Sequence, residues 1–232
     1  MFFLKPISRR KFISLAGAAG AGLVLTGCPG ANKGETGTAI ELLDRQHGIL
    51  RRAVSILEEV KGGMDARMDL PPEIIQGTVE VVRRLVVDYH QKMEEKYIYP
   101  PFDTAKKMGG LVGVLREQHE AGAQLTEILG RLAAGFSARD LEKRRTMGSA
   151  IHQFARMYRA HADREDTLLF PLLRQVVAPG AFAKLDEAFL KDDGQFMGQN
   201  GFDEAVQKLA GLENALGIGD LAAFTPRMEE LR

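Results

Sequence analysis

Residues 90–100 read His-Gln-Lys-Met-Glu-Glu-Lys-Tyr-Ile-Tyr-Pro, and residues 161–171 read His-Ala-Asp-Arg-Glu-Asp-Thr-Leu-Leu-Phe-Pro. Each stretch places a glutamate four residues after its histidine and a proline ten residues after it. A further histidine precedes each stretch at a similar distance, His47 by 43 residues and His119 by 42 residues. The chain therefore contains the same pattern of two histidines and one glutamate twice.

The similarity between the two copies extends beyond these residue types. Leu43-Asp-Arg-Gln-His47 aligns with residues 115–119, which read Leu-Arg-Glu-Gln-His. The tripeptide Ile-Tyr-Pro at 98–100 aligns with Leu-Phe-Pro at 169–171. A single His-x-x-x-Glu motif is typical of an ordinary amphipathic helix with a core histidine and a solvated glutamate. Two copies in matching frames favour instead two similar helix pairs around one centre with near two-fold symmetry.

The spacing within each copy suits metal binding. Residues four apart on an α-helix lie one above the other, so His90 and Glu94 present a nitrogen and a carboxylate to the same point. Imidazole suits iron, zinc or copper, and a carboxylate offsets part of the charge of the cations that it binds. The doubled pattern therefore predicts six protein ligands for two metal ions, which are His47, His90, Glu94, His119, His161 and Glu165.

Every predicted ligand also lies on an apolar helix face. The stripe expected around His90 is Val79, Val82, Val86, His90, Met93, Glu94 and Tyr97. The stripe expected around His161 is Ile151, Phe154, Tyr158, His161, Glu165, Leu168 and Leu172. An ionised glutamate buried on such a face is very costly unless a cation accompanies it. The stripes therefore favour buried metal ions over solvated carboxylates.

Two other residues near the fourth-helix motif need assignment. Asp166 lies five residues after His161, about 140° away around an α-helix, so it reaches the same metal only across a π-helical bulge. Glu165 matches Glu94 in the repeat and needs no bulge, and we favour it over Asp166 as the ligand. The fifth histidine, His152, points about 180° away from His161 and is expected to lie outside the centre.

Together these motifs resemble the haemerythrin-like, or HHE cation-binding, proteins over residues 40–216. The resemblance implies an all-α, antiparallel up-down four-helix bundle that holds two iron ions in a non-haem di-iron centre, although other divalent metals suit the same ligands. It implies one histidine pair for each iron and two bridging carboxylates: His47 with His90, His119 with His161, and Glu94 and Glu165 between them. A ferritin-like di-iron bundle is excluded, because its Glu-x-x-His motif does not occur around these histidines.

The sequence departs from the pattern of oxygen carriers at one position. Oxygen-carrying haemerythrins have a further histidine four residues after the third-helix histidine, and this chain has Ala123 there. The neighbouring Gly122 takes the place that Leu50 has in the first copy. The lack of side-chain bulk predicts either an open coordination position for a small ligand on the His119–His161 side or closer helix packing.

Two classes of function are compatible with such a centre. One is binding, as a carrier, buffer or sensor of O2 or a related diatomic, or of iron itself. The other is an enzyme that reduces peroxide or nitric oxide. The sequence contains no reductase partner domain and no obvious acid–base group, which favours binding. Tyr97, seven residues after His90, is expected either to bring hydrogen-bond or redox chemistry to the centre or to pack in the core.

Caps, glycines and prolines predict the helix boundaries. Four long helices are expected: from about 38 to 60 before Gly62-Gly63, from Pro71-Pro72 to Pro100-Pro101, from about 107 to 134, and from a capping box at Ser137-Ala-Arg-Asp140 to about 177. Two short helices are expected at 182–190 and 202–216. The chain then divides into a four-helix domain at 38–178 and a C-terminal extension at 179–232 that packs on it.

The N-terminal segment resembles an export signal. Ser8-Arg-Arg-Lys-Phe-Ile13 is similar to the twin-arginine motif, and the apolar run at 12–25 is too short to span a membrane. Leu25-Thr-Gly-Cys28 is similar to a lipobox, in which Cys28 is the lipidated residue. We expect a signal and lipobox at 1–28, with an ordinary cleaved signal or a weak membrane anchor as the alternatives. A flexible tether at 29–37 would then connect the domain to a membrane of the cell envelope, on its periplasmic side where two membranes are present.

Composition and charge agree with an exported metal protein. Cys28 is the only cysteine, so the folded part has no internal disulfide and no thiolate ligand. Residues 1–27 contain four basic residues and no acidic ones, which leaves 27 basic and 31 acidic residues in the rest of the chain. A mildly acidic surface predicts no binding to nucleic acid. The expected partners are therefore a small diatomic ligand and a membrane reached through Cys28.

Overall fold

The computed structural model describes residues 37–68, 70–136, 140–198 and 201–231, which form helices and turns with no strand among them. The expectation of an all-α fold is confirmed for these residues. The described residues belong to one compact unit. The signal and lipobox expected at 1–28 lie outside the described residues, as does the tether expected at 29–37 apart from its last residue.

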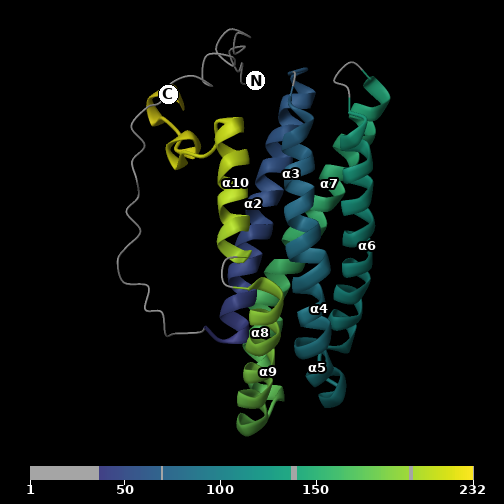
Figure 1. The fold of residues 1–232 in the computed structure, drawn as a ribbon, viewed down its shortest axis with the longest axis vertical. Helices are drawn as coiled ribbons and strands as arrows, with labels where there is room; N and C mark the ends of the chain where they lie inside the picture. Colours follow the sequence, from purple (N-terminus) through teal and green to yellow (C-terminus); the bar gives the residue numbers. More distant parts are fainter. Residues whose placement is uncertain (1–36, 69, 137–139, 199–200, 232) are drawn as a thin grey trace. The chain divides into compact units, whose positions relative to one another are not determined.

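The described residues form four long helical stretches and two further helices (Figure 1). The first and third stretches are single α-helices, α2 (Ala39–Asp65) and α6 (Gly109–Ala134). The second stretch runs through α3 (Pro72–Val81), η2 (Val82–His90), α4 (Gln91–Met93), η3 (Glu94–Ile98) and α5 (Tyr99–Ala105), and η2 and η3 are π-helical. The fourth runs through α7 (Leu141–Arg164), the π-helical η4 (Glu165–Leu169) and α8 (Phe170–Val176). The chain continues with α9 (Pro179–Met197), α10 (Gly201–Leu216) and the 3-10 turns η5 (Leu221–Phe224) and η6 (Met228–Leu231).

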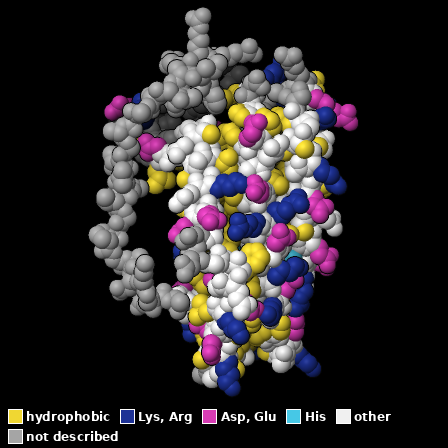
Figure 2. Space-filling model, in the orientation of Figure 1, with side chains coloured by type: hydrophobic (Ala, Val, Ile, Leu, Met, Phe, Trp, Pro, Cys, Tyr) yellow, Lys and Arg dark blue, Asp and Glu magenta, His cyan; other side chains and the backbone are white. Residues whose placement is uncertain are grey.

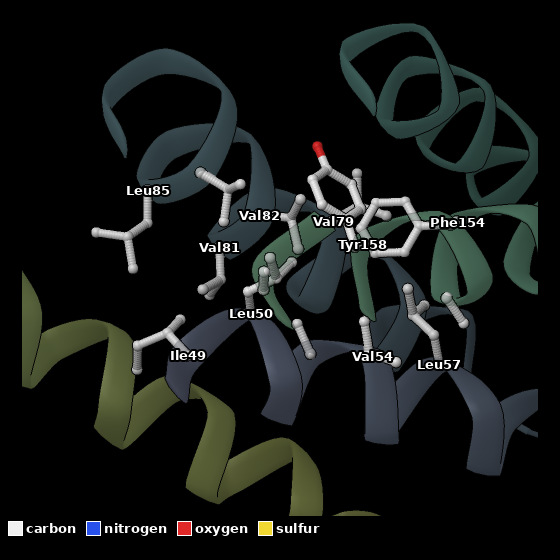
Figure 3. Close-up of a cluster of buried hydrophobic side chains, with 14 of the residues drawn as sticks. Ile49, Leu50, Val54, Leu57, Val79, Val81, Val82, Leu85, Phe154 and Tyr158 are labelled. Atoms are coloured by element: carbon white, nitrogen blue, oxygen red, sulfur yellow. The ribbon is translucent and has the colours of Figure 1, made fainter. Parts of the chain in front are cut away.

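The apolar faces of the four stretches meet in one core. Helix α2 packs against α7 and against the second stretch, and α6 packs against the same two partners. In Figure 3, Leu50, Val54 and Leu57 of α2 lie beneath Val82 of η2 and Phe154 of α7. Each of these five side chains is at most 2% exposed. The core therefore contains the apolar stripes that the 3.6-residue period predicted.

Side-chain caps define the starts of two helices. Before α2, Thr38 accepts from the N–H of Glu41 at 3.3 Å, and the N–H of Thr38 donates to the Glu41 carboxylate at 2.7 Å. Before α7, the carboxylate of Asp140 accepts from two N–H groups of the first turn. Ser137, the first residue of the predicted capping box, lies outside the described residues, and Asp140 is the observed cap.

The helices run past the residues that were predicted to end them. Helix α2 continues through Gly62-Gly63 to Asp65, and the second stretch continues through Pro100-Pro101 to Ala105. A proline within a helix lacks an N–H group, and its ring collides with the carbonyl four residues earlier. Because the wider π turn η3 ends just before these prolines and η4 ends just before Pro171, the backbone accommodates the rings and the helix continues.

The π turns η3 and η4 each shift the buried face of their helical stretch by one residue. Leu168, predicted in the core, is 42% exposed, whereas its neighbour Leu169 is fully buried. In the second stretch Tyr97 is only partly buried, whereas its neighbour Ile98 is fully buried, as is Tyr99. The predicted stripes are therefore correct as far as the glutamate of each copy and wrong by one residue beyond it.

The two C-terminal helices pack on the first and second stretches. Helix α10 lies along α2 and α3, and α9 contacts α2 (Figure 1). Arg52 of α2 and Glu213 of α10 form a two-pronged ion pair with N–O distances of 2.8 and 2.6 Å. Leu209 of α10 is fully buried. Helix α9, with 19 residues, is longer than the predicted 182–190, whereas α10 (Gly201–Leu216) matches the predicted 202–216 to within one residue.

The outer surface is polar and mixed in charge. Figure 2 shows acidic and basic side chains interspersed over the visible face, and neither sign forms a continuous patch there. Among the described residues, no helix combines the length and the apolar character needed to cross a membrane.

Candidate metal centre

Six buried polar side chains, contributed by all four stretches, converge on one point. Their exposed fractions lie between 0 and 2%. They are the six predicted ligands: His47 of α2, His90 of η2, Glu94 of η3, His119 of α6, His161 of α7 and Glu165 of η4. The structure thus brings together every side chain that the sequence assigned to the centre, and their binding of metal stays a prediction.

These side chains form two groups that share both glutamates. One group contains His47 and His90, and the other contains His119 and His161. Within each group the candidate donor atoms lie within 4.8 Å of one another. The side chains therefore offer two adjacent cation positions with two shared carboxylates.

Glu94 faces both groups of histidines. Its Oε1 lies 3.2 Å from Nε2 of His90, four residues earlier on the same helical stretch. Its Oε2 lies 3.3 Å from Nε2 of His119 in the other group. Because its two oxygens point to different groups, Glu94 has the geometry of a carboxylate that bridges two cations.

Glu165 occupies the equivalent place in the second copy. Its Oε2 lies 3.0 Å from Nε2 of His161 and 3.4 Å from Nε2 of His47. The alternative ligand, Asp166, has its carboxylate on the outer side, where Oδ1 lies 2.6 Å from Nδ1 of His47 and Oδ2 accepts from Arg51. A π turn does begin at Glu165, but it leaves Asp166 outside the centre. The geometry favours Glu165.

Two histidines are held from outside by glutamines of their own copy. Oε1 of Gln46 lies 2.9 Å from Nδ1 of His90, and Oε1 of Gln118 lies 3.1 Å from Nδ1 of His161. Each glutamine directly precedes the first histidine of its copy and holds the second. Such outer partners fix the ring orientation and the tautomer of metal-binding histidines.

The other two histidines are hydrogen-bonded by acids of the opposite copy. Asp166 accepts from Nδ1 of His47 at 2.6 Å, and Glu95 accepts from Nδ1 of His119 at 2.9 Å. Both acids directly follow the glutamate of their copy, so each copy holds the first histidine of the other. Sequence reasoning missed these outer partners, although the aligned Gln-His pairs and the acid after each glutamate were visible signals.

The inward-facing atoms fit a pair of cations. A carboxylate only accepts hydrogen bonds, so Nδ1 of His47 and of His119 must carry a proton, and the lone pair of each neutral ring lies on Nε2. These lone pairs face carboxylate oxygens. Both oxygens of Glu94 and Oε2 of Glu165 have no hydrogen-bond partner among the described residues. Such an arrangement is costly in a buried site, and divalent iron or a similar cation is bound by imidazole and carboxylate alike.

In the metal-free protein, the surrounding carboxylates favour the protonated form of two histidines. Burial of His47 opposes its charged form, yet its hydrogen bond to Asp166 and the nearby carboxylate of Glu165 raise its pKa to about 10. Burial also opposes the charged form of His119, but the carboxylate of Glu94, 3.3 Å from its Nε2, outweighs burial and raises the pKa of His119. Metal binding therefore competes with protons at both rings.

The metal-free protein should lose stability as the pH rises above neutrality. A histidine whose pKa is raised by folding stabilises the folded state below its ordinary pKa of 6.5, and for His47 this contribution disappears as the pH passes about 10. The expected loss in the free energy of unfolding is on the order of a few kcal/mol. Urea unfolding of chelator-treated protein at a series of pH values measures it.

The metal-loaded protein should show the opposite trend near neutrality. Its stability should increase from about pH 5 to pH 7, because the ligands must lose protons before they bind metal. A metal-free protein that is equally stable at about pH 6 and pH 10 would contradict the raised pKa of His47.

The fifth histidine lies outside the centre, as expected. His152 is exposed on α7 and lines a surface groove with Glu58, Arg156 and Arg159. No candidate metal group among the described residues includes it.

The tyrosine at the centre is Tyr99 rather than Tyr97. The hydroxyl of Tyr97 donates to Asp192 of α9 at 2.7 Å, away from the histidines. The hydroxyl of Tyr99 donates to Oε1 of Glu165 at 2.7 Å. On a regular α-helix Tyr99 would lie about 180° from His90, and the π turn η3 reduces this angle. The alignment of Ile-Tyr-Pro with Leu-Phe-Pro was the sequence signal for this position.

The space beside Gly122 is filled, so the predicted opening for a small ligand there is wrong. A Cβ atom on Gly122 would overlap the hydroxyl oxygen of Tyr158 and would lie 2.6 Å from its Cζ. Tyr158 is 1% exposed, and its hydroxyl accepts a hydrogen bond from Gln91 at 3.0 Å. The structure supports the alternative expectation, which was closer helix packing.

Gly122→Ala should therefore destabilise the protein by about 1–3 kcal/mol, because the added methyl group overpacks the Tyr158 contact. Gly113→Ala is the matched control on the same helix, since a Cβ atom there meets nothing within 4 Å. The control should stabilise the helix by about 0.5–1 kcal/mol. Urea unfolding of the metal-free variants separates the two effects, and a Gly122→Ala protein as stable as the control would refute the close contact.

The region in which this chain is similar to known proteins includes all six candidate ligands. The family model described as "Hemerythrin HHE cation binding domain" matches residues 38–188. An uncharacterized protein of Mycobacterium tuberculosis is 32% identical over 233 aligned positions, which cover 95% of this chain and 91% of that relative. An uncharacterized protein of Mycobacterium bovis matches with the same identity and coverage. No solved structure matches the chain.

Proposed function

This chain belongs to the haemerythrin HHE cation-binding family, and on that basis we propose that it is a non-haem di-iron protein that binds O2 or a related diatomic ligand. The observation that carries the proposal is the set of buried carboxylate oxygens without hydrogen-bond partners that face four imidazole nitrogens. In this proposal the four helical stretches form an antiparallel up-down bundle, and each stretch contributes ligands to the centre.

The proposed ligand roles follow the two groups of side chains. One iron would be held by His47 and His90, the other by His119 and His161, and both glutamates would bridge them. Bound iron would supply the redox-active position at which a diatomic ligand binds. The protein residues orient the rings through their Nδ1 atoms and exclude water, since all six side chains are buried. Other divalent metals suit the same nitrogen and oxygen donors.

Iron loading and oxygen exposure test this function. The full chain would be loaded with ferrous iron without air, exposed to O2 and then deoxygenated, while its visible spectrum is recorded. Spectral bands that appear with O2 and disappear on its removal support binding of O2. Sustained consumption of peroxide or nitric oxide by the loaded protein would instead make it a reductase, and no iron uptake would exclude the di-iron proposal. His119→Ala serves as the control that lacks one of the histidines.

We also propose that the protein is exported by the twin-arginine route and is anchored to a membrane of the cell envelope through Cys28. The sequence from Ser8 to Cys28 supports this proposal, and it lies outside the described residues. A folded metal centre suits this route, because twin-arginine export carries folded proteins.

Replacing Arg9 and Arg10 by lysines should leave the precursor inside the cell. Cys28→Ala should allow export of a protein without lipid. Cell fractionation and metabolic labelling with a fatty acid measure both results. Normal envelope localisation of the double-lysine variant would indicate a general secretory route.

A further inference from the structure

The repeat places two aromatic rings at equivalent positions of the centre. Tyr99 and Phe170 each lie five residues after the glutamate of their copy. Tyr99 stacks on His119 with a centroid distance of 5.4 Å and an interplanar angle of 26°, and Phe170 stacks on His47 at 5.7 Å and 10°. The two rings therefore cover the first histidine of the opposite copy in the same way, and they differ by one hydroxyl group.

That hydroxyl group lies among the candidate donor atoms. The Tyr99 oxygen is 2.7 Å from Oε1 of Glu165 and 3.0 Å from Nε2 of His119, and the Tyr99 side chain is fully buried. Its single proton bonds to the carboxylate. Nδ1 of His119 donates to Glu95, so its Nε2 carries a lone pair when the ring is neutral, and this lone pair faces the Tyr99 oxygen. A cation between the two atoms would be bound by both.

The distances suit donors of one metal ion. Two ligand atoms bound at right angles, with bonds of about 2.1 Å, lie about 3.0 Å apart. Nε2 of His161 lies 3.0 Å from Oε2 of Glu165, and the Tyr99 oxygen lies 3.0 Å from Nε2 of His119. The Tyr99 oxygen thus has the spacing of the predicted ligands, whereas Phe170 offers no donor on the other side.

We propose that Tyr99 is a seventh protein ligand, which binds the iron of the His119–His161 group as a phenolate. The inference rests on the proposed di-iron function. On binding, an O–Fe bond replaces the O–H bond, and the phenol proton leaves to solvent. The His119–His161 iron then has five protein donors and the His47–His90 iron has four, because Phe170 stands in the place of Tyr99 and offers no donor. The His47–His90 iron therefore keeps more coordination positions for a small ligand.

Spectroscopy of the iron-loaded full chain tests this proposal. Ferrous iron is loaded without air and oxidised with ferricyanide, since a phenolate bound to ferric iron gives a charge-transfer band in the visible. The band should carry tyrosine ring vibrations in its resonance Raman spectrum, and these should shift when the protein is grown on ring-deuterated tyrosine. Tyr99→Phe should lose the band completely while it retains bound iron. Tyr97→Phe is the matched control and should keep the band, because its hydroxyl bonds to α9.

The outcomes distinguish this inference from the proposed function. Wild-type protein with two irons and no tyrosine band, or Tyr99→Phe with the band intact, overturns the ligand role and leaves the di-iron centre standing. Wild-type protein without iron overturns both. If Tyr99→Phe does not fold, the tyrosine that causes the band is identified from variants of the other three of the chain's four tyrosines. Bands retained in Tyr89→Phe, Tyr97→Phe and Tyr158→Phe would identify Tyr99, and loss in one of these variants would refute it.

Discussion

Glu165→Ala should lower the iron content from two ions per chain to less than one, whereas Asp166→Ala should still bind two at saturating iron. Glu165 is buried between His161 and His47, with its Oε2 3.0 and 3.4 Å from their Nε2 atoms. Its loss removes a donor from both groups at once. Among the candidate ligands, Asp166 contacts only His47, at its outer nitrogen.

The two substitutions therefore test different roles, since Glu165→Ala removes a metal ligand and Asp166→Ala removes only an outer hydrogen-bond partner. Loss of an outer partner typically weakens metal affinity by about 10–100-fold without removing the site, so Asp166→Ala should bind two irons with lower affinity. Metal analysis after desalting, followed by a titration with a competing chelator, measures content and affinity. His152→Ala should match wild type in both. If Asp166→Ala lost its iron while Glu165→Ala still bound two ions, Asp166 would be the ligand and Glu165 the outer partner.

Metal loading should raise the melting temperature by on the order of 10–20 °C. A ligand that binds only the folded state stabilises it by about 2.7 kcal/mol at a free concentration one hundred times its Kd. Two such sites contribute about 5 kcal/mol, and each kcal/mol corresponds to about 2–4 °C for a chain of this size. Calorimetry with and without anaerobic ferrous iron measures the shift.

The increase should depend on the shared carboxylates. Glu94→Gln should lose most of it, because the amide cannot bridge two cations. Glu213→Gln is the matched control, since Glu213 pairs with Arg52 outside the centre, and it should keep the full metal-dependent increase. An equal increase in both variants would show that iron stabilises the protein elsewhere.

The sequence predicted the six converging side chains because helical spacing and burial act within one helix. The 3.6-residue period placed His90 and Glu94 on one buried face, and the structure has them there. The same period failed beyond Glu94, where the π turn before Pro100 moves Tyr99 instead of Tyr97 into the centre. Such a turn depends on how the backbone relaxes around the proline ring, which a regular period does not represent.

Contacts between helices were harder to predict than contacts along one helix. Gly122 was interpreted as a possible opening beside the metals, but Tyr158 from α7 fills that space. The role of Asp166 was likewise hidden, because its partner His47 lies 119 residues away in the sequence. Both relations depend on the relative rotation of packed helices, and no single-helix pattern contains that information.

The crossed support of the histidines makes the halves of the centre interdependent. Asp166 from the second copy holds His47 of the first, and Glu95 from the first copy holds His119 of the second. A protein with only one copy would lack the acid that orients its first histidine, unless a second molecule of the same kind supplied it. Two separate helix pairs would therefore complete the centre only by pairing with each other, because each pair supplies the outer acid for the other.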